Sequence, residues 1–156
     1  MNTVDFYLRL SLEDDDLKDE SNSITSQREI LKNYISSREE FTGVKIREHI
    51  DDGYTGTNFN RPAFQKMIGL MKKNEIRTIL VKDLSRFARD YIESGAYIEQ
   101  IFPFMQVRFI SVNDNYDSNN NENGISSLEI PFKNLVYDYY SKDISQKISS
   151  SVRVRQ

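Results

Sequence analysis

Short apolar segments alternate along this chain with longer segments of helical periodicity, and this alternation restricts the folds that the chain can adopt. The apolar segments are typical of buried strands and cover residues 3–9, 44–50, 78–81 and 107–112. Amphipathic helices are predicted between them, over residues 24–35, 62–71 and 91–102. Because this βαβαβαβ order joins parallel strands by helical crossovers, it predicts an α/β fold with a mainly parallel sheet covered by helices.

Two prolines mark boundaries of the predicted helices. Pro62 suits the first turn of the second helix. Apolar residues recur through that helix at Phe64, Met67, Ile68 and Met71. Pro103 is expected to end or kink the third helix. Residues 51–56, before the second helix, contain Asp and Gly and are expected to form a turn.

The composition limits the chemistry that this protein can perform. With 156 residues, of which 38% are hydrophobic, the chain is long enough to form one soluble domain with a buried core. It has no cysteine, which excludes disulfides and thiolate metal sites, and its one histidine, His49, argues against a zinc site made of imidazoles. Hydroxyls, carboxylates, lysines and arginines remain for any chemistry.

Neither a membrane span nor a signal peptide is expected. No apolar run approaches the roughly 20 residues that a membrane-spanning helix needs. The first residues of the chain have neither the basic start nor the apolar stretch of a signal peptide. We therefore expect a cytoplasmic protein that makes no contact with a membrane.

Charge is distributed unevenly along the chain. The formal net charge of -3 argues against a free-standing DNA-binding protein, because Lys and Arg supply most of the non-specific affinity for DNA. Residues 13–20 are acidic, whereas residues 142–155 are basic and contain one acidic residue, Asp143. The basic residues there are Lys142, Lys147, Arg153 and Arg155. We interpret this basic end as a contact toward another module.

The last third of the chain departs from the alternation of strands and helices. Residues 113–124 are dominated by Asn, Asp and Ser, which favour loops, and are expected to form a mobile connection. From Leu128 onward apolar residues recur every three or four positions, which predicts a long helix to the end of the chain. Its apolar stripe continues through Ile144, Ile148 and Val152, and we expect it to pack against a second copy of the chain.

Polar motifs follow two of the predicted strands. The first is Tyr7-x-Arg9-x-Ser11, and the second is Leu84-Ser85-Arg86-Phe87-x-Arg89. Arg9 and Ser11 share one face of a strand, because alternate residues do. Ligands of open parallel sheets bind outside the carboxyl ends of the strands, so both motifs should lie at the same edge. Several arginines near one serine favour phosphoryl chemistry over acyl chemistry, because a guanidinium matches phosphate oxygens.

Each of these signals has an ordinary structural explanation when it stands alone. A serine at a strand end is usually a turn or cap residue, and arginines three positions apart, such as Arg86 and Arg89, usually lie on a solvated helix face. The stem of Arg61 could simply cover apolar surface. Ser23 and Gln27 are ordinary residues for the start of a helix. The order of the motifs is therefore more specific than any one of them.

Five motifs occur in one order along the chain: Tyr7-x-Arg9-x-Ser11, Ser23-Ile24-x-x-Gln27, Asp52-Gly-x-Thr-Gly56, Arg61-Pro62-x-Phe64 and Leu84-Ser85-Arg86-Phe87-x-Arg89. In this order the chain resembles, over nearly its whole length, the catalytic domain of serine site-specific recombinases, the resolvase and invertase family. It is most similar to the large serine recombinases of conjugative transposons. Ser85 and Ala88 depart from the small resolvases, which usually carry Asp and Gly at these positions.

The resemblance implies recombination of double-stranded DNA, in which Ser11 cleaves a strand and forms a covalent 5′-phosphoserine intermediate before the strands are exchanged and rejoined. The phosphate would be bound by Arg9, Arg61, Arg86 and Arg89. A supporting or DNA-binding role is assigned to the other candidates, Tyr7, Ser23, Gln27, Asp52, Ser85, Lys142, Lys147, Arg153 and Arg155. The resemblance implies that no metal and no other cofactor is required.

The resemblance also implies a domain organisation and an assembly. Residues 1–125 would form the catalytic core, and residues 126–156 would form a long helix that makes oligomer contacts and approaches the DNA, before DNA-binding domains that are expected to follow. The protein would form a homodimer, and a tetramer in the synaptic complex. We expect the chain to be a catalytic-domain fragment that is inactive and binds DNA weakly by itself.

Three other classes of protein remain open at this point. A phosphoacceptor receiver domain would use the acidic run at residues 14–16 with Lys82 and bind Mg²⁺. A metal-dependent nuclease would combine the same acidic run with Asp51 and Asp52. An assembly module without enzymatic activity would use only its C-terminal helix. Dependence on Mg²⁺ and a covalent adduct with DNA distinguish these classes from a recombinase.

Overall fold

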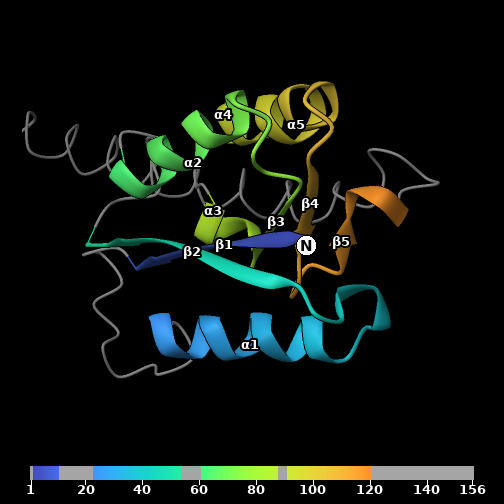
Figure 1. Cartoon of the computed structure of the whole chain (residues 1–156). Helices are drawn as coiled ribbons and strands as arrows, with labels where there is room; N and C mark the ends of the chain where they lie inside the picture. The colour runs from blue at the N-terminus through green and yellow to red at the C-terminus, as the bar shows by residue number, and fades with distance from the viewer. Residues whose placement is uncertain (1, 11–22, 54–60, 88–90, 121–156) are drawn as a thin grey trace, which may run out of the picture.

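A five-stranded sheet forms the centre of the computed structural model (Figure 1), which describes residues 2–10, 23–53, 61–87 and 91–120. The strands are β1 (Thr3–Leu10), β2 (Lys45–Asp52), β3 (Thr78–Val81), β4 (Arg108–Ser111) and β5 (Tyr116–Asp117). Their order across the sheet is β2-β1-β3-β4-β5. The first four strands are parallel, and β5 pairs antiparallel with β4. The predicted mainly parallel sheet is therefore confirmed.

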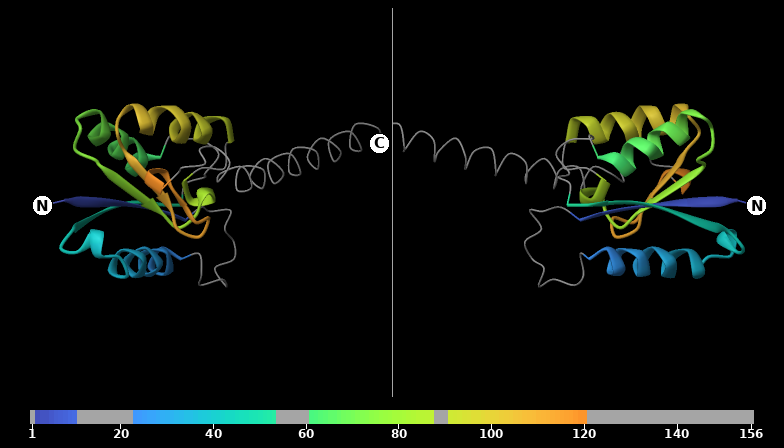
Figure 2. Two further views of the ribbon diagram at one scale, coloured as in Figure 1. Left: turned by 90° about the vertical axis from the view of Figure 1, so that its right-hand side faces the viewer. Right: turned by 60° about the vertical axis from the view of Figure 1, so that its left-hand side comes forward.

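Helices cover both faces of this sheet, as predicted. They are α1 (Ile24–Ser36), α2 (Pro62–Lys72), α4 (Tyr91–Ala96) and α5 (Phe102–Phe104). Helix α1 lies on one face, and the other three lie on the opposite face (Figure 1, Figure 2). Among the residues that the structure describes, no helix has the length and apolar character needed to cross a membrane.

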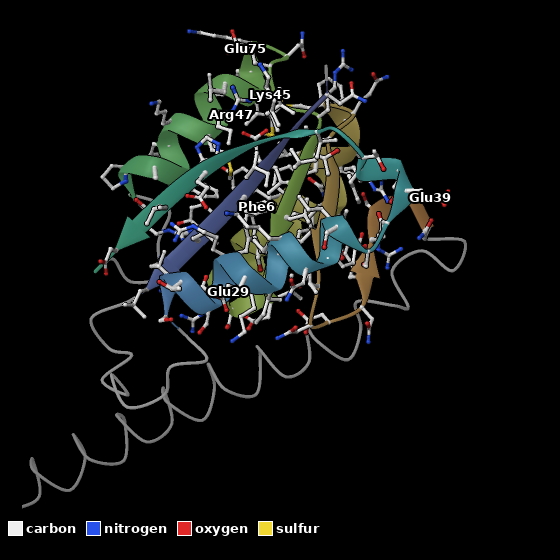
Figure 3. All side chains as sticks on the ribbon, turned by 60° about the horizontal axis from the view of Figure 1, so that its bottom comes forward. Phe6, Glu29, Glu39, Lys45, Arg47 and Glu75 are labelled. Atoms are coloured by element: carbon white, nitrogen blue, oxygen red, sulfur yellow. The ribbon has the colours of Figure 1, made fainter. Side chains whose placement is uncertain are left out.

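Strand β1 supplies core residues to both faces, because successive side chains of a strand point to opposite sides. Val4, Phe6 and Leu8 pack in one core with residues of α1, and Phe6 lies between β1 and α1 (Figure 3). Tyr7 packs in the second core with residues of α2. Burial of one large apolar side chain contributes about 1.5–3 kcal/mol. Burial on both faces is typical of a central strand in a parallel sheet.

A buried polar cluster joins β1 to the edge strand β2. Asp5 is fully buried, and its carboxylate accepts hydrogen bonds of 2.6 and 3.3 Å from the guanidinium of Arg47. The Nε2 of His49 lies 2.8 Å from the same carboxylate. Arg47 also donates a hydrogen bond of 3.0 Å to the backbone carbonyl of Glu75, and both residues lie at one end of the sheet (Figure 3). The cluster therefore fixes β2 against β1 and against the segment after α2.

Replacing Asp5 with asparagine is expected to lower the free energy of unfolding by about 2 kcal/mol, because Arg47 and His49 lose a charged acceptor in a buried place. Urea denaturation followed by circular dichroism measures this loss. The control is Arg28→Gln, which breaks a part-exposed ion pair with Glu48 of 2.5 Å. That change is expected to cost less than about 1 kcal/mol. Equal losses in the two variants would contradict the assigned strength of the Asp5 cluster.

The expectation of a loop over residues 113–124 is wrong for residues 116–120, which form β5 and the 3-10 turn η4 (Ser118–Asn120). The hydroxyl of Ser118 accepts a hydrogen bond of 2.9 Å from the backbone N–H of Phe109. Asp117 accepts two hydrogen bonds from Arg108, at 2.9 and 2.5 Å. Polar residues that usually favour loops thus pair with the sheet here. Residues 121–124 and the helix predicted after them lie outside the described residues.

The third predicted helix continues past Pro103. Helical turns run from α4 through the π-helical segment η3 (Tyr97–Ile101) to α5, which contains Pro103. The N–H of Phe102 bonds to the carbonyl of Tyr97, five residues back. Because the helical ladder is already shifted before Pro103, the missing N–H of proline does not end it there. The helix ends after Phe104, one residue beyond the proline.

Candidate functional site

The carboxyl ends of three neighbouring parallel strands, β2, β1 and β3, meet at one edge of the sheet. Arg9 lies next to the last residue of β1, and Asp51 and Asp52 end β2. The short helix α3 (Leu84–Phe87) begins just after β3. Residues that are far apart in the sequence are therefore brought to one place by the parallel topology.

Arg9 connects the two polar motifs found in the sequence. Its side chain is 0% exposed, and its Nε donates a hydrogen bond of 3.1 Å to the carbonyl of Arg86. Its Nη2 donates one of 2.6 Å to the carbonyl of Ser85. In return, Nη1 of Arg86 donates to the carbonyl of Arg9 at 3.2 Å. The prediction that the two motifs lie at the same edge of the sheet is confirmed for Arg9, Ser85 and Arg86.

Gln27 holds the backbone of Arg9. Its Nε2 donates a hydrogen bond of 2.9 Å to the carbonyl of Arg9, and its Oε1 accepts one of 3.3 Å from the N–H of Arg9. Gln27 is fully buried in the first turn of α1. Ser23 caps this helix by accepting a hydrogen bond of 3.0 Å from the N–H of Ser26. The structure thus places Gln27 against the backbone of Arg9 and Ser23 at the start of α1.

Two carboxylates fix the start of α3, and no sequence motif predicts this role for either of them. Asp114 accepts a hydrogen bond of 2.9 Å from the first N–H of α3 and one of 2.7 Å from the hydroxyl of Ser111. Asp83 accepts a hydrogen bond of 3.1 Å from the N–H of Arg86 and another from the hydroxyl of Ser85. Because the first N–H groups of a helix have no partner within it, these carboxylates stabilise α3 where it begins.

Arg61 reaches the same edge from the start of α2. Its Nη2 donates a hydrogen bond of 2.7 Å to the carbonyl of Phe87, the last residue of α3. Its guanidinium lies over the rings of Tyr7 and Phe64, with Cζ 5.3 and 4.9 Å from the two ring centroids. These separations are typical of cation–π contacts. Arg61 therefore packs on aromatic surface and also directs a donor to α3.

Asp51 is buried at the end of β2 and binds the first turn of α2. Its Oδ1 accepts a hydrogen bond of 2.8 Å from the N–H of Ala63. Its Oδ2 accepts one of 3.0 Å from the N–H of Phe64 and one of 2.8 Å from the hydroxyl of Tyr7. A signal for this role exists in the sequence, because Arg61 at the N-cap of α2 has no side-chain acceptor and the first turn needs one from elsewhere.

Tyr7 is kept in its neutral form by its surroundings. Burial raises the pKa of its hydroxyl above the ordinary value of 10.0. The charge of Arg61 opposes this rise in the pKa, whereas the charge of Asp51 and the hydrogen bond to Asp51 add to it. The folded protein therefore holds the proton of Tyr7 at pH values at which the unfolded chain releases it.

This raised pKa predicts a loss of stability at high pH. The contribution of Tyr7 is complete below the unfolded pKa of about 10 and is lost as the pH rises above it, because only the unfolded chain then ionises the hydroxyl. Wild-type protein is expected to be more stable than Tyr7→Phe at about pH 8, and the difference is expected to shrink at about pH 11. Thermal unfolding of both proteins measures it. A difference that stays constant would show that Tyr7 has the same pKa in both states.

The remaining predicted site residues fall into two groups. Asp52 is exposed at the end of β2, where Gly53 turns the chain with a φ of 87°. Six others lie outside the described residues: Ser11, Arg89, Lys142, Lys147, Arg153 and Arg155. The acidic run at residues 14–16 also lies outside them. Within the part of the chain that the structure describes, no group of three or more His, Cys, Asp or Glu side chains is placed to hold a metal ion.

Comparison with known families gives one match that spans the chain. A family model described as "Resolvase, N terminal domain" matches residues 5–154. No curated protein sequence is similar enough to count as a relative.

Solved structures share this fold. The N-terminal catalytic domain of TP901-1 integrase has a TM-score of 0.65 and 21% identity, covering 92% of this chain and 98% of that chain. A resolvase family site-specific recombinase from Streptococcus pneumoniae has a TM-score of 0.62 and 24% identity, covering 97% of this chain and 99% of that chain. The C-terminal catalytic domain of ISC1926 TnpA, an IS607-like serine recombinase, has a TM-score of 0.53 and 21% identity, covering 90% and 84%.

Proposed function

We propose that this chain, which belongs to the resolvase N-terminal domain family, cleaves and rejoins double-stranded DNA in site-specific recombination through Ser11. The Oγ of Ser11 attacks the phosphorus of a backbone phosphate and loses its proton. A bond from phosphorus to Oγ forms, and the bond from phosphorus to the 3′ oxygen breaks. The 3′ oxygen takes up a proton. The products are a serine-linked 5′ phosphate and a free 3′ hydroxyl, and the reverse reaction rejoins the strands.

The observation that carries this proposal is the convergence of three arginines from separate segments of the chain. Arg9 comes from β1, Arg61 from the start of α2 and Arg86 from α3, and hydrogen bonds to backbone carbonyls connect them. Their charges are permanent and suit phosphate oxygens. Donors that are already in place stabilise a transferring phosphoryl group with little reorganisation, and loss of one such donor typically costs about 10²–10³ in rate.

The hydrogen bonds of Asp51 argue against the nuclease alternative. Both oxygens of its carboxylate already accept hydrogen bonds, from two N–H groups of α2 and from the hydroxyl of Tyr7. A metal ion bound there would compete with these donors for the carboxylate. The start of α2, and Arg61 with it, would lose its support.

Further parts of the proposal rest on the resemblance. Arg89 completes the phosphate-binding set, and the basic residues between 142 and 155 approach the DNA. Residues 1–125 form the catalytic core, and the long helix over residues 126–156 forms the homodimer, two of which build the synaptic tetramer. The protein acts in the cytoplasm, needs no metal, and is a recombinase of the kind carried by conjugative transposons.

The test is a search for a covalent protein–DNA adduct in EDTA. The protein is incubated with a plasmid containing the DNA from both sides of its gene, and the products are separated on a denaturing gel. We expect an adduct joined through a 5′ phosphate, which mass spectrometry locates on the peptide containing Ser11. Cleavage that requires Mg²⁺ and leaves no adduct would overturn the proposal in favour of a nuclease. If neither cleavage nor an adduct is detected, the result favours an assembly module without enzymatic activity.

A further inference from the structure

We propose that Asp51 is a positioning residue for Arg61, which it holds in place through the first turn of α2 and the ring of Tyr7. Asp51 stands outside the five motifs that carry the resemblance. The consequence of this placement for strand cleavage rests on the proposed function. The placement itself can be tested without DNA.

Asp51 takes over the capping of α2 because the residue at the cap position cannot do so. That residue is Arg61, whose side chain makes no capping hydrogen bond. Asp51 binds the N–H groups of Ala63 and Phe64 instead, at 2.8 and 3.0 Å. The carbonyl of Arg61 accepts a hydrogen bond of 2.9 Å from the N–H of Gln65, which begins the helical ladder. The backbone of Arg61 is therefore fixed only as long as this first turn is formed.

Asp51 also fixes the two rings on which the guanidinium of Arg61 lies. It binds Tyr7 through the hydroxyl at 2.8 Å and Phe64 through the backbone N–H at 3.0 Å. The two rings pack edge to face, with their centroids 5.7 Å apart. Cζ of Arg61 lies 5.3 Å from one centroid and 4.9 Å from the other. A single carboxylate thus fixes both the backbone from which the Arg61 side chain extends and the aromatic surface on which its guanidinium lies.

This support directs Arg61 toward the other arginines. Its Nη2 donates to the carbonyl of Phe87 at 2.7 Å, and the neighbouring carbonyls of α3 accept hydrogen bonds from Arg9. If the first turn of α2 opened, the guanidinium of Arg61 would leave this group. A displacement of about 1 Å in a reacting group can cost about 10²-fold in rate.

The kinetic test compares the rate of adduct formation in wild-type protein, Asp51→Asn, Arg61→Ala and the double variant. Asparagine keeps the size of the side chain, but its Nδ2 cannot accept the hydrogen bonds that Oδ2 accepts. We expect each single change to slow adduct formation by about 10²-fold, and the double variant to be within about threefold of Arg61→Ala, because Asp51 acts through Arg61. If the loss of rate in the double variant equals the product of the two single losses, Asp51 does not act through Arg61 and the inference is overturned.

The matched control is Asp5→Asn, a second buried carboxylate changed to its amide. It is expected to lose stability, yet to keep its rate of adduct formation within about threefold of wild type when measured well below its Tm. A loss of rate in Asp5→Asn as large as in Asp51→Asn would show that destabilisation alone explains the effect, and would overturn the positioning role.

An NMR measurement on the chain without DNA separates this inference from the proposed function. The Nε–H signal of Arg61 in ¹⁵N-labelled protein is identified by its absence from Arg61→Ala. In Asp51→Asn we expect this signal to shift and its exchange with water to become faster. An unchanged signal would overturn the inference even if the recombinase function holds. If wild-type protein forms no adduct, the recombinase function fails, and the Arg61 signal still decides whether Asp51 positions Arg61.

Discussion

Replacing Ser11 with alanine is expected to abolish the covalent protein–DNA adduct while leaving the fold unchanged. Without the hydroxyl no bond from protein to phosphorus can form, so the loss is complete rather than partial. The denaturing gel in EDTA measures the adduct, and circular dichroism measures the fold. The control is Ser36→Ala, which removes an exposed hydroxyl at the end of α1. It is expected to form the adduct at the wild-type rate.

The chain is held in place by hydrogen bonds just before Ser11. Arg9 lies two positions earlier, and its backbone N–H and carbonyl are both bonded to the side chain of Gln27. Its guanidinium is bonded to α3. An adduct that persists in Ser11→Ala would show that another residue is the nucleophile, and the arginine group would then need a different interpretation.

Replacing Phe87 with alanine is expected to lower the free energy of unfolding by about 3–5 kcal/mol. Phe87 is 0% exposed and packs against several aromatic rings. Its ring centroid is within 5.2–6.2 Å of those of Phe109, Phe64, Phe102 and Tyr97. Removing the ring leaves a cavity that these rigid neighbours cannot fill.

Urea denaturation of two further variants tests this explanation. Phe104→Ala removes a ring that is 88% exposed, and is expected to change the free energy of unfolding by less than about 0.5 kcal/mol. Phe87→Leu keeps part of the buried volume, and is expected to lie between Phe87→Ala and wild type. A loss below about 1 kcal/mol in Phe87→Ala would show that the aromatic core is not packed around this residue.

The regular elements of the fold could be predicted because their patterns are local. Short apolar runs and period-3.6 patterns indicate strands and helices within a few residues of their true bounds. The segment around Tyr116 could not be predicted in this way, because its two-residue strand is defined by antiparallel pairing with β4. The side chains of Asp117 and Ser118 add contacts to Arg108 and to the backbone N–H of Phe109. The helix α3 has four residues, too few for a periodic signal, and two carboxylates at its start stabilise it.

The site was predictable where it depends on topology and was missed where it depends on single contacts. The meeting of Arg9 with Arg86 follows from the rule that parallel strands end at one edge. The role of Asp51 depends on a cap formed across 12 and 13 residues of sequence. Its signal in the sequence, the lack of a capping side chain at Arg61, does not identify the residue that supplies the cap. Gln27 was expected as a supporting contact, and its hydrogen bonds show that it contacts the backbone of Arg9.

Arg9 and Arg61 donate hydrogen bonds to main-chain oxygens of α3. Every amino acid carries such an oxygen. Such acceptors depend on the path of the chain and not on the identity of the side chains along it. Ser85 therefore offers its main-chain oxygen to Arg9 independently of its own side chain. An engineer could vary the part-exposed side chain at position 85 without removing that oxygen, provided that Asp83 and Asp114 keep the turn in place.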